Sequence, residues 1–269
     1  MSDYKPLPDF FMCSPDYYDV NYTINPWMSI LNSPNRNLAR SQWLALYQLL
    51  ESFNAKVEVV TPVNCPDLVF IADAGIIHNN TFVISNFKFN QRRAETPFWK
   101  SYFSDRFDLV EIDNNETYEG SGDSFISGDS LFCGYGFRTT AKAASYFCEK
   151  INLQPKLIEL IDERFYHLDT CFSPLKNNNA LIYPKAFSKK GLSDLENNFD
   201  CYEILEEEAL NFACNIVSFN NNIIINSGST NTISTLERFD YLVNEVDLSE
   251  FIKAGGSAKC LTLKLNQRI

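Results

Sequence analysis

Short apolar segments alternate with amphipathic ones along most of the sequence, and this alternation restricts the fold more than any other feature. The apolar segments are rich in β-branched residues and end in Asn, Gly, Pro or Asp, which is typical of strands. The expected strands lie at 55–62, 67–73, 81–87, 108–113, 129–137, 156–161, 179–184, 214–226 and 260–265. Apolar residues at helical spacing predict helices at 37–55, 96–107, 139–152 and 203–215. The pattern indicates an α/β fold.

The spacing of these elements also bears on the number of domains. Strand and helix recur at comparable intervals from about residue 57 to the end, which favours a closed architecture of repeated modules. Asn-rich stretches at 177–179 and 219–223 are typical of turns between strands, and no Pro/Ser-rich linker divides the chain. A chain of 269 residues can bury one large core. We therefore expect a single domain over residues 1–269.

The sequence is acidic, because 23 Lys and Arg residues stand against 34 Asp and Glu residues and give a formal net charge of −11. Such a chain lacks the basic surface that binds DNA, RNA or anionic lipid, so neither nucleic acid nor a membrane is an expected partner. There is no signal-peptide pattern and no apolar stretch long enough to span a bilayer, which predicts a cytoplasmic protein. The eight cysteines form no C-x-x-C pair, so neither disulfides nor a zinc site are expected.

Two residues are candidates for covalent chemistry. Cys260 follows a Gly-Gly pair that would let a ligand approach the backbone, and the adjacent Lys259 would favour the reactive thiolate. His167, one of two histidines, is followed two residues later by Asp169 on a segment expected to be extended, where both side chains would point the same way. A cysteine with a distant histidine is a candidate nucleophile and base. Taken alone, however, each is better explained as a buried thiol or a hydrogen-bonded histidine.

Several acidic residues lie in apolar or Gly-rich surroundings. Glu119 precedes a Gly-Ser-Gly turn, while Asp67 and Asp73 lie at the two ends of an apolar run that contains no Lys or Arg. Buried carboxylates are costly unless a cation is paired with them, and a cationic ligand is one way to supply it; capping and turn roles are the alternatives. One thiol, one imidazole and several carboxylates together suit a planar cation with an electrophilic carbon, such as a guanidinium group.

Seven motifs resemble, in order and at suitable spacing, the guanidine-modifying enzyme superfamily. This superfamily includes arginine deiminases, dimethylarginine dimethylaminohydrolases, amidinotransferases and arginine dihydrolases. The motifs are MCSPDYYDVNYTINPWM, DLVFIADAG, YEGSGDS, GYGFRT, FYHLDTCFSPL, NALIYPKAFS and GGSAKCLTLKL, and they extend from about Phe11 to Leu265. The resemblance implies a pseudo-fivefold α/β propeller in which ββαβ modules surround a central, acidic substrate channel.

For the chemistry, the resemblance implies covalent catalysis that needs neither a metal nor an organic cofactor. Cys260 would attack the guanidinium carbon, and His167 would protonate the departing nitrogen. Glu119 would hold the guanidinium and relay protons. Water activated by His167 would then release a ureido product from the thiouronium intermediate.

For recognition, the resemblance implies a larger set of residues. The residues implied to bind the substrate are Asp73, Asp169, Asp67, Phe70, Arg92, Arg138 and Asn25. Asp73 and Asp169 would bind the guanidinium nitrogens, whereas Arg92 and Arg138 match the positions that bind an α-carboxylate. The expected partner is therefore a small, arginine-like guanidino molecule, and the resemblance is compatible with a homo-oligomer.

Two departures from related enzymes bear on the reaction. Dimethylarginine hydrolases have a lysine where this chain has Asp169, and a carboxylate there suits an unsubstituted amino group, which favours free arginine. Arginine dihydrolases have Asn where this chain has Asp73, which favours a single hydrolysis to citrulline and ammonia. The alternatives are an arginine dihydrolase that makes ornithine, a dimethylarginine dimethylaminohydrolase, and a catalytically silent arginine-binding protein on the same fold.

Overall fold

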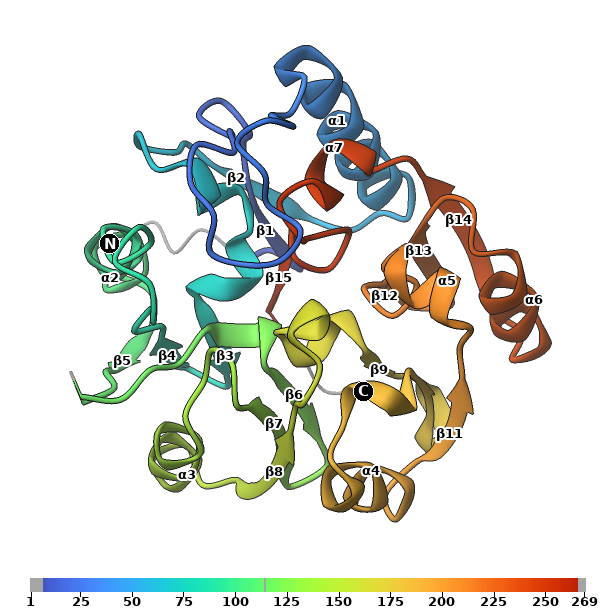
Figure 1. Cartoon of the computed structure of the whole chain (residues 1–269). Coiled ribbons are helices and arrows are strands. Elements are labelled where there is room, and N and C mark those ends of the chain that lie inside the picture. Colours follow the sequence, from blue (N-terminus) through green and yellow to red (C-terminus); the bar gives the residue numbers. More distant parts are fainter. Residues whose placement is uncertain (1–6, 114, 266–269) are drawn as a thin grey trace.

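The computed structural model describes residues 7–113 and 115–265, and the strands in these ranges form five three-stranded sheets. Figure 1 shows the sheets arranged around a common centre, with most of the longer helices on the outer rim. The described strands are β1 (Phe10–Cys13), β2 (Val57–Val60), β3 (Gly75–His78), β4 (Thr81–Ile84), β5 (Asp108–Val110), β6 (Ser124–Ser127), β7 (Ser130–Tyr135), β8 (Gln154–Glu159), β9 (Phe172–Pro174), β10 (Asn179–Ile182), β11 (Asp200–Glu203), β12 (Val217–Phe219), β13 (Asn222–Asn226), β14 (Leu242–Val246) and β15 (Leu263–Lys264). The described helices are α1 (Arg36–Ser52), α2 (Glu95–Phe103), α3 (Ala141–Lys150), α4 (Lys189–Glu196), α5 (Glu206–Leu210), α6 (Thr230–Arg238) and α7 (Ser249–Ile252).

Each sheet repeats one topology. The middle strand pairs antiparallel with one neighbour and parallel with the other, as in the sheets β3-β4-β5 and β6-β7-β8. Because parallel neighbours require a crossover, a helix connects each parallel pair: α1, α2, α3, α4 and α6 in the five sheets. In the first sheet the outer antiparallel strand is β15, from the far end of the chain, and Phe11 pairs with Leu263. The expected α/β fold with five ββαβ-type modules is confirmed.

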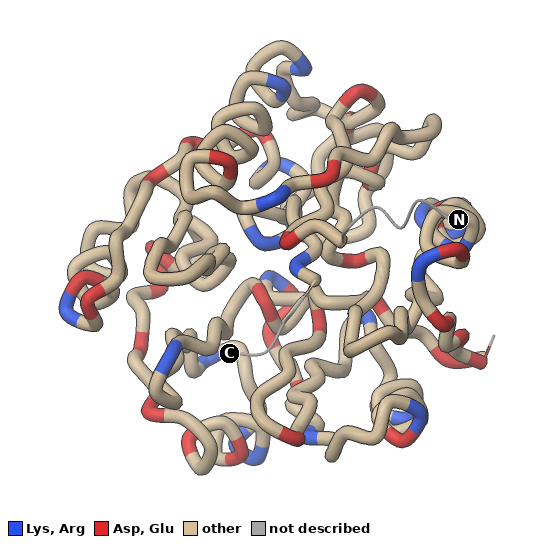
Figure 2. Tube along the Cα trace, turned by 180° about the vertical axis from the view of Figure 1, so that it is seen from behind, with Lys and Arg blue, Asp and Glu red and all other residues tan. Residues whose placement is uncertain are grey.

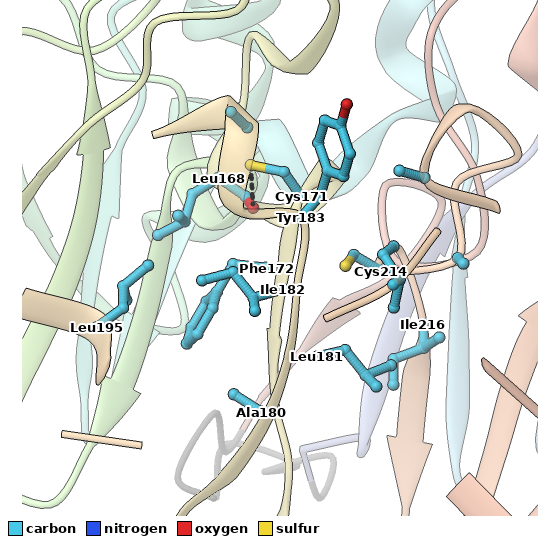
Figure 3. Packing of buried hydrophobic residues seen from close by; sticks show 14 of the residues in the cluster. Leu168, Cys171, Phe172, Ala180, Leu181, Ile182, Tyr183, Leu195, Cys214 and Ile216 are labelled. Atoms are coloured by element: carbon cyan, nitrogen blue, oxygen red, sulfur yellow. Dashed lines mark hydrogen bonds between the residues drawn. The ribbon is translucent and has the colours of Figure 1, made fainter. Parts of the chain in front are cut away.

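The core beside the fourth module shows how packing fixes the central loops. Leu168, Cys171 and Phe172 are fully buried and lie among the apolar side chains of β10 and its neighbours (Figure 3). The Cys171 thiol donates to the carbonyl oxygen of Leu168 at 3.5 Å, which closes the short turn that these residues flank. Asp169 lies inside that turn, so the apolar side chains around it hold its backbone in place.

Three expected strands are wrong in detail. In the segment 260–265 only Leu263–Lys264 forms a strand, so Cys260 lies in the turn before it. The segment 67–73 contains two 3-10 turns, Pro66–Val69 and Ile71–Ala74, because its two acidic residues are held by contacts with distant parts of the chain. The segment around His167 is not a strand either: His167 precedes a 3-10 turn over Leu168–Thr170. The expected turns at 177–179 and 219–223 are confirmed at the β9–β10 and β12–β13 connections.

Charged residues of both signs are distributed over the modules. Figure 2 shows acidic and basic positions interspersed along the trace, with several of each sign close to the centre of the propeller. Within the described ranges, no helix combines the length and the apolar character that crossing a membrane would require.

Candidate active site

A cavity of about 270 Å³ lies where central loops of several modules meet. Its lining residues are Ile24, Asn25, Met28, Asp67, Phe70, Asp73, Arg92, Arg138, Tyr166, His167, Ala254, Gly255, Gly256 and Cys260. Two further candidates lie directly behind this lining, since Glu119 contacts His167 and Asp169 contacts Cys260. The structure thus brings together every residue that the sequence singled out, and their individual roles stay predictions.

Cys260 lies among groups that disfavour its ionisation. Its buried Sγ is 3.7 Å from Asp169 Oδ2 and accepts a hydrogen bond from Asn215 Nδ2 at 3.2 Å. Burial raises the pKa of the Cys260 thiol well above its usual range; Asp169 and Asp73 add to this effect, and Lys259 opposes it. Formation of the thiolate therefore requires additional positive charge beside Cys260.

The Gly-Gly pair before Cys260 is needed for contacts within the protein. Gly255 has a φ of 83°, and a Cβ at this position would lie 2.7 Å from the hydroxyl oxygen of Tyr166. That hydroxyl donates to the carbonyl oxygen of Gly255 at 2.6 Å. A Cβ on Gly256 would lie 2.5 Å from the ring of Phe70. The two glycines therefore let the rings of Phe70 and Tyr166 form part of the cavity wall beside the nucleophile.

His167 is surrounded by carboxylates. Its Nε2 lies 2.9 Å from Glu119 Oε2, its Nδ1 lies 3.6 Å from Asp73 Oδ1, and Asp123 Oδ2 is 4.0 Å from Nε2. Burial alone would lower the pKa of the imidazole, but Asp73, Asp123 and Glu119 outweigh burial and raise the pKa of His167 to about 9. The imidazole is therefore protonated at neutral pH and can act as a general acid.

Glu119 is held in its ionised form by two cations. Burial would raise the pKa of Glu119, but Arg138 and His167 outweigh it and bring this pKa below its usual range. Arg138 Nη1 donates to Glu119 Oε2 at 2.7 Å, and its guanidinium lies over the rings of Phe89 and Tyr166, with centroid distances of 4.8 and 4.4 Å. Arg138 also lines a wider depression of about 860 Å³, which shares four lining residues with the cavity. This position suits contact with the outer end of a bound molecule.

Arg92 is occupied by the protein itself. Its Nη1 donates to Asp73 Oδ2 at 2.5 Å, and its Nε and Nη2 donate to the two oxygens of Glu95 at 2.7 and 2.9 Å. Nη2 also donates to the backbone oxygen of Asp67 at 3.3 Å. In this arrangement Arg92 is the counter-cation of a buried acidic group, and its expected contact with a substrate carboxylate stays a prediction.

The N-terminal INPWM motif closes one side of the cavity. Asn25 Nδ2 donates to the carbonyl oxygen of Ala254 at 3.0 Å, and Trp27 Nε1 donates to that of Arg164 at 2.8 Å. Just before the motif, the Tyr22 hydroxyl donates to Asp67 Oδ2 at 2.9 Å. These bonds join the segment before α1 to the loops that carry His167 and Cys260.

Sequence reasoning assigned no role to three buried polar residues around the site. Glu95 pairs with Arg92 and Asn215 contacts Cys260, as described above. Asp123 accepts hydrogen bonds from the Thr139 hydroxyl at 2.6 Å and from the backbone of Leu168 at 3.1 Å. Burial raises the pKa of Asp123 to about 7 and that of Glu95 to about 7. Glu95 lies three residues after the candidate Arg92, and Asp123 lies in the YEGSGDS motif with Glu119, so these positions were available signals in the sequence. For Asn215 we find no such signal.

Across residues 7–113 and 115–265, no group of three or more His, Cys, Asp or Glu side chains is arranged to hold a metal ion.

Comparison with known sequences identifies the family. The family described as N,N dimethylarginine dimethylhydrolase, eukaryotic, matches residues 8–267. The chain belongs to this family. Membership of the guanidine-modifying superfamily is thereby confirmed.

The names of the chain's relatives state two different activities. The bifunctional arginine dihydrolase/ornithine cyclodeaminase AgrE of Nostoc is 40% identical over 97% of this chain and 38% of AgrE. The N(G),N(G)-dimethylarginine dimethylaminohydrolase of Mycobacterium tuberculosis is 31% identical over 96% of this chain and 85% of that protein. The chain therefore spans well under half the length of the bifunctional relative.

A solved structure agrees with the fold. The N-terminal domain of ArgZ, in an Asn-to-Ser variant covalently bound to a reaction intermediate, has a TM-score of 0.92 and 38% identity. The match covers 97% of this chain and 98% of that domain. The propeller fold is confirmed by this similarity.

Proposed function

We propose that the chain acts in the cytoplasm as a hydrolase on the guanidinium carbon of arginine or a close derivative. A covalent thiouronium intermediate on Cys260 would give citrulline, or the matching ureido product, and ammonia. The observation that carries the proposal is the cavity itself, in which a thiol and a protonated imidazole lie together among buried carboxylates. Such a site suits a planar cation that carries an electrophilic carbon.

The proposed reaction begins with the charge of the substrate. A bound guanidinium places positive charge next to Cys260 and so lowers the pKa of the thiol, which favours the thiolate and the release of the thiol proton to solvent. The thiolate forms a bond to the guanidinium carbon, and the protonated His167 donates its proton to the departing nitrogen, which leaves as ammonia. The now neutral His167 takes a proton from water as that water attacks the thiouronium carbon. Breakage of the C–S bond releases the ureido product and the thiolate.

The contacts of Asp73 support a single hydrolysis. One oxygen, Oδ2, binds Arg92. The other, Oδ1, has no hydrogen-bond partner among the described residues and lies 3.6 Å from His167 Nδ1. Oδ1 is therefore the acceptor left for a substrate N–H group. A carboxylate holds a cationic guanidinium more strongly than a neutral ureido group, so the first product would leave before a second attack.

Formation of ornithine is the second candidate. It is favoured by the 40% identity to a protein named as an arginine dihydrolase, AgrE. The family name and the M. tuberculosis relative make dimethylarginine the third candidate. A silent arginine-binding protein is the non-enzymatic alternative.

Product identification separates these candidates. The protein would be incubated with arginine, agmatine, monomethylarginine and dimethylarginine, and the products identified by mass spectrometry. We expect citrulline and one ammonia per arginine. Ornithine with two ammonia molecules would replace the proposal with a dihydrolase, and turnover of dimethylarginine alone would replace it with a dimethylargininase. Binding without any product would support the silent protein.

A further inference from the structure

Asn215 is a fully buried residue in the turn between α5 and β12 that contacts the reacting sulfur atom. Its Nδ2 donates to Cys260 Sγ and to the carbonyl oxygen of Asp169, each at 3.2 Å. Its Oδ1 accepts a hydrogen bond from the backbone nitrogen of Cys260 at 3.2 Å. We propose that Asn215 is a further catalytic residue, whose amide donates a hydrogen bond to the Cys260 thiolate and fixes the position of its sulfur. This inference rests on the proposed covalent mechanism.

The surroundings of Cys260 explain why such a donor is needed. In the neutral form the thiol faces Asp169, at 3.7 Å from Oδ2, and can donate to it. Once the proton is lost, this contact becomes a repulsion between two negative charges, to which Asp73 adds. Lys259 is the cation on the same segment, but its Nζ is bonded to Asp169 and to the backbone oxygen of Ser121. The Asn215 amide is therefore a donor that points directly at the sulfur.

The hydrogen-bond pattern fixes which end of the amide faces the sulfur. The acceptor oxygen of Asn215 is used by the N–H of Cys260, and one amide hydrogen is used by the carbonyl of Asp169. The remaining amide hydrogen is directed at Sγ. Reversal of the amide would place its oxygen against the carbonyl of Asp169 and its nitrogen against a backbone donor, which is unfavourable. A carboxylate at this position would lose both donors.

The turn that carries Asn215 is held rigidly. The backbone nitrogen of Asn215 donates to the carbonyl oxygen of Phe212 at 2.9 Å, and its carbonyl oxygen accepts from the backbone nitrogen of Lys259 at 3.3 Å. Phe212 has a φ of 61°, which is unusual for a bulky residue, and its ring packs against Trp27 of the INPWM motif at 4.9 Å. Packing on the cavity-closing segment thus supports a costly backbone conformation three residues before Asn215.

The repeated architecture points to the same residue. In four of the five modules, a candidate site residue lies shortly before the strand that pairs antiparallel with the middle strand. Asp73 precedes β3, Glu119 precedes β6, Asp169 precedes β9 and Cys260 precedes β15. In the fifth module the equivalent place, two residues before β12, is that of Asn215. Asn215 is thus the contribution of this module to the centre of the propeller.

The test measures the ionisation of Cys260 without any substrate. Wild type, Asn215→Ala, Asn215→Ser and Asn215→Asp would be alkylated with iodoacetamide from about pH 6 to about pH 10, and the modified Cys260 peptide quantified by mass spectrometry. We expect the apparent pKa to rise from wild type through Ser and Ala to Asp. At about pH 8, the alkylation rate of the Ala variant should fall about tenfold or more. The serine hydroxyl should restore part of the rate, because it can donate one bond.

A matched control uses another buried asparagine. Asn226 Nδ2 donates to Asn211 Oδ1 at 2.8 Å, and its Oδ1 accepts from the backbone nitrogen of Leu248 at 2.9 Å. Neither of these hydrogen bonds involves Cys260. Asn226→Asp should leave the pH profile of Cys260 alkylation unchanged. Thermal melting of each variant identifies any chain that fails to fold. If Asn215→Ala does not fold, the alkylation of Asn215→Ser is compared with that of wild type.

Activity gives an independent readout. Asn215 does not line the cavity, so its replacement should lower kcat for arginine while KM changes little. Folded Ala and Ser variants with the wild-type alkylation profile would overturn the role of Asn215, whatever the protein hydrolyses. If the alkylation rates follow the predicted order but the protein hydrolyses no guanidino compound, the proposed function is overturned. The hydrogen bond from Asn215 to the thiolate would then still stand.

Discussion

Cys260 and His167 line one cavity, and buried carboxylates, of which Asp73 is common to both, act on each of them. Burial with Asp169 and Asp73 keeps the thiol neutral, whereas Asp73, Asp123 and Glu119 keep the imidazole protonated. These effects favour His167 as a proton donor and disfavour the thiolate of Cys260. A guanidinium ion among these carboxylates would favour the thiolate, so the substrate itself would help to activate its nucleophile.

The charge of His167 should make folding stability depend on pH. Its folded-state pKa, about 9, exceeds the ordinary value of 6.5, so the folded protein holds this proton more tightly than the unfolded chain. The resulting stabilisation, on the order of 3 kcal/mol, is complete below the ordinary value and is lost as pH rises through about 9. We expect the midpoint of urea unfolding to fall over this range in wild type and less in His167→Asn. Equal pH dependence in both proteins would contradict the assignment.

The two buried arginines should differ when replaced. Arg92→Ala removes the counter-cation of Glu95 and Asp73, so we expect a loss of about 3–5 kcal/mol in unfolding free energy.

Arg138→Ala should weaken binding of arginine more than that of agmatine, which lacks the carboxylate, by about 2–5 kcal/mol if the pair is buried. Urea titration and binding calorimetry measure the two effects, and Arg93→Ala, at an exposed position next to Arg92, is the control. Equal losses for both ligands would assign Arg138 to the fold.

Replacement of Asp73 tests how one position selects the product. In Asp73→Asn, the neutral amide can donate to the ureido oxygen as well as accept from its nitrogen, so this product should be retained longer. We expect ornithine to appear beside citrulline in a timed product assay of the variant, and only citrulline in wild type. Ornithine as the main product of wild type would show that Asp73 does not limit the reaction to one step.

Helices and strands with a clear local apolar pattern are predicted by the sequence. Segments whose conformation depends on contacts with distant parts of the chain are not. The apolar strand Asn222–Asn226 and the helix Arg36–Ser52 have clear periodicity and were expected. The segment 67–73 is equally apolar, yet it forms 3-10 turns because Asp67 and Asp73 bind Tyr22 and Arg92 from distant parts of the chain. Strands as short as Phe172–Pro174 carry too few residues for a pattern. Motifs located the site, whereas Asn215 is visible only once the modules are assembled.

The glycine loop before Cys260 gives a prediction at this scale. Gly255→Ala introduces a Cβ 2.7 Å from the Tyr166 hydroxyl at a φ of 83°, which should displace the loop that carries the nucleophile. We expect kcat/KM for arginine to fall at least about tenfold, since a shift of about 1 Å at a catalytic group can cost far more. Gly128→Ala is the control, because its φ is 56° but a Cβ there meets nothing within 4 Å. Similar losses in the two variants would mean that backbone strain, and not the contact with Tyr166, is responsible.

For the whole molecule, closure of the ring determines where the nucleophile lies. β15 begins three residues after Cys260 and pairs with β1. This pairing places the two ends of the described chain in one sheet. Five modules then direct their preceding loops toward the centre, which brings residues as distant in the sequence as Asp73 and Cys260 into one cavity. The active-site arrangement is thus a property of the closed propeller and of no single module.

Mass spectrometry of the intact protein during turnover tests the central proposal, covalent catalysis by Cys260, most directly. Wild type mixed with arginine and quenched in acid should contain a fraction of chains heavier by one arginine less one ammonia, and peptide mapping should place this adduct on Cys260. Cys260→Ser should show neither adduct nor turnover, while Cys65→Ser, which replaces a cysteine outside the cavity lining, should behave as wild type. Rapid release of ammonia from arginine by Cys260→Ser, or the same adduct on that variant, would contradict the covalent mechanism.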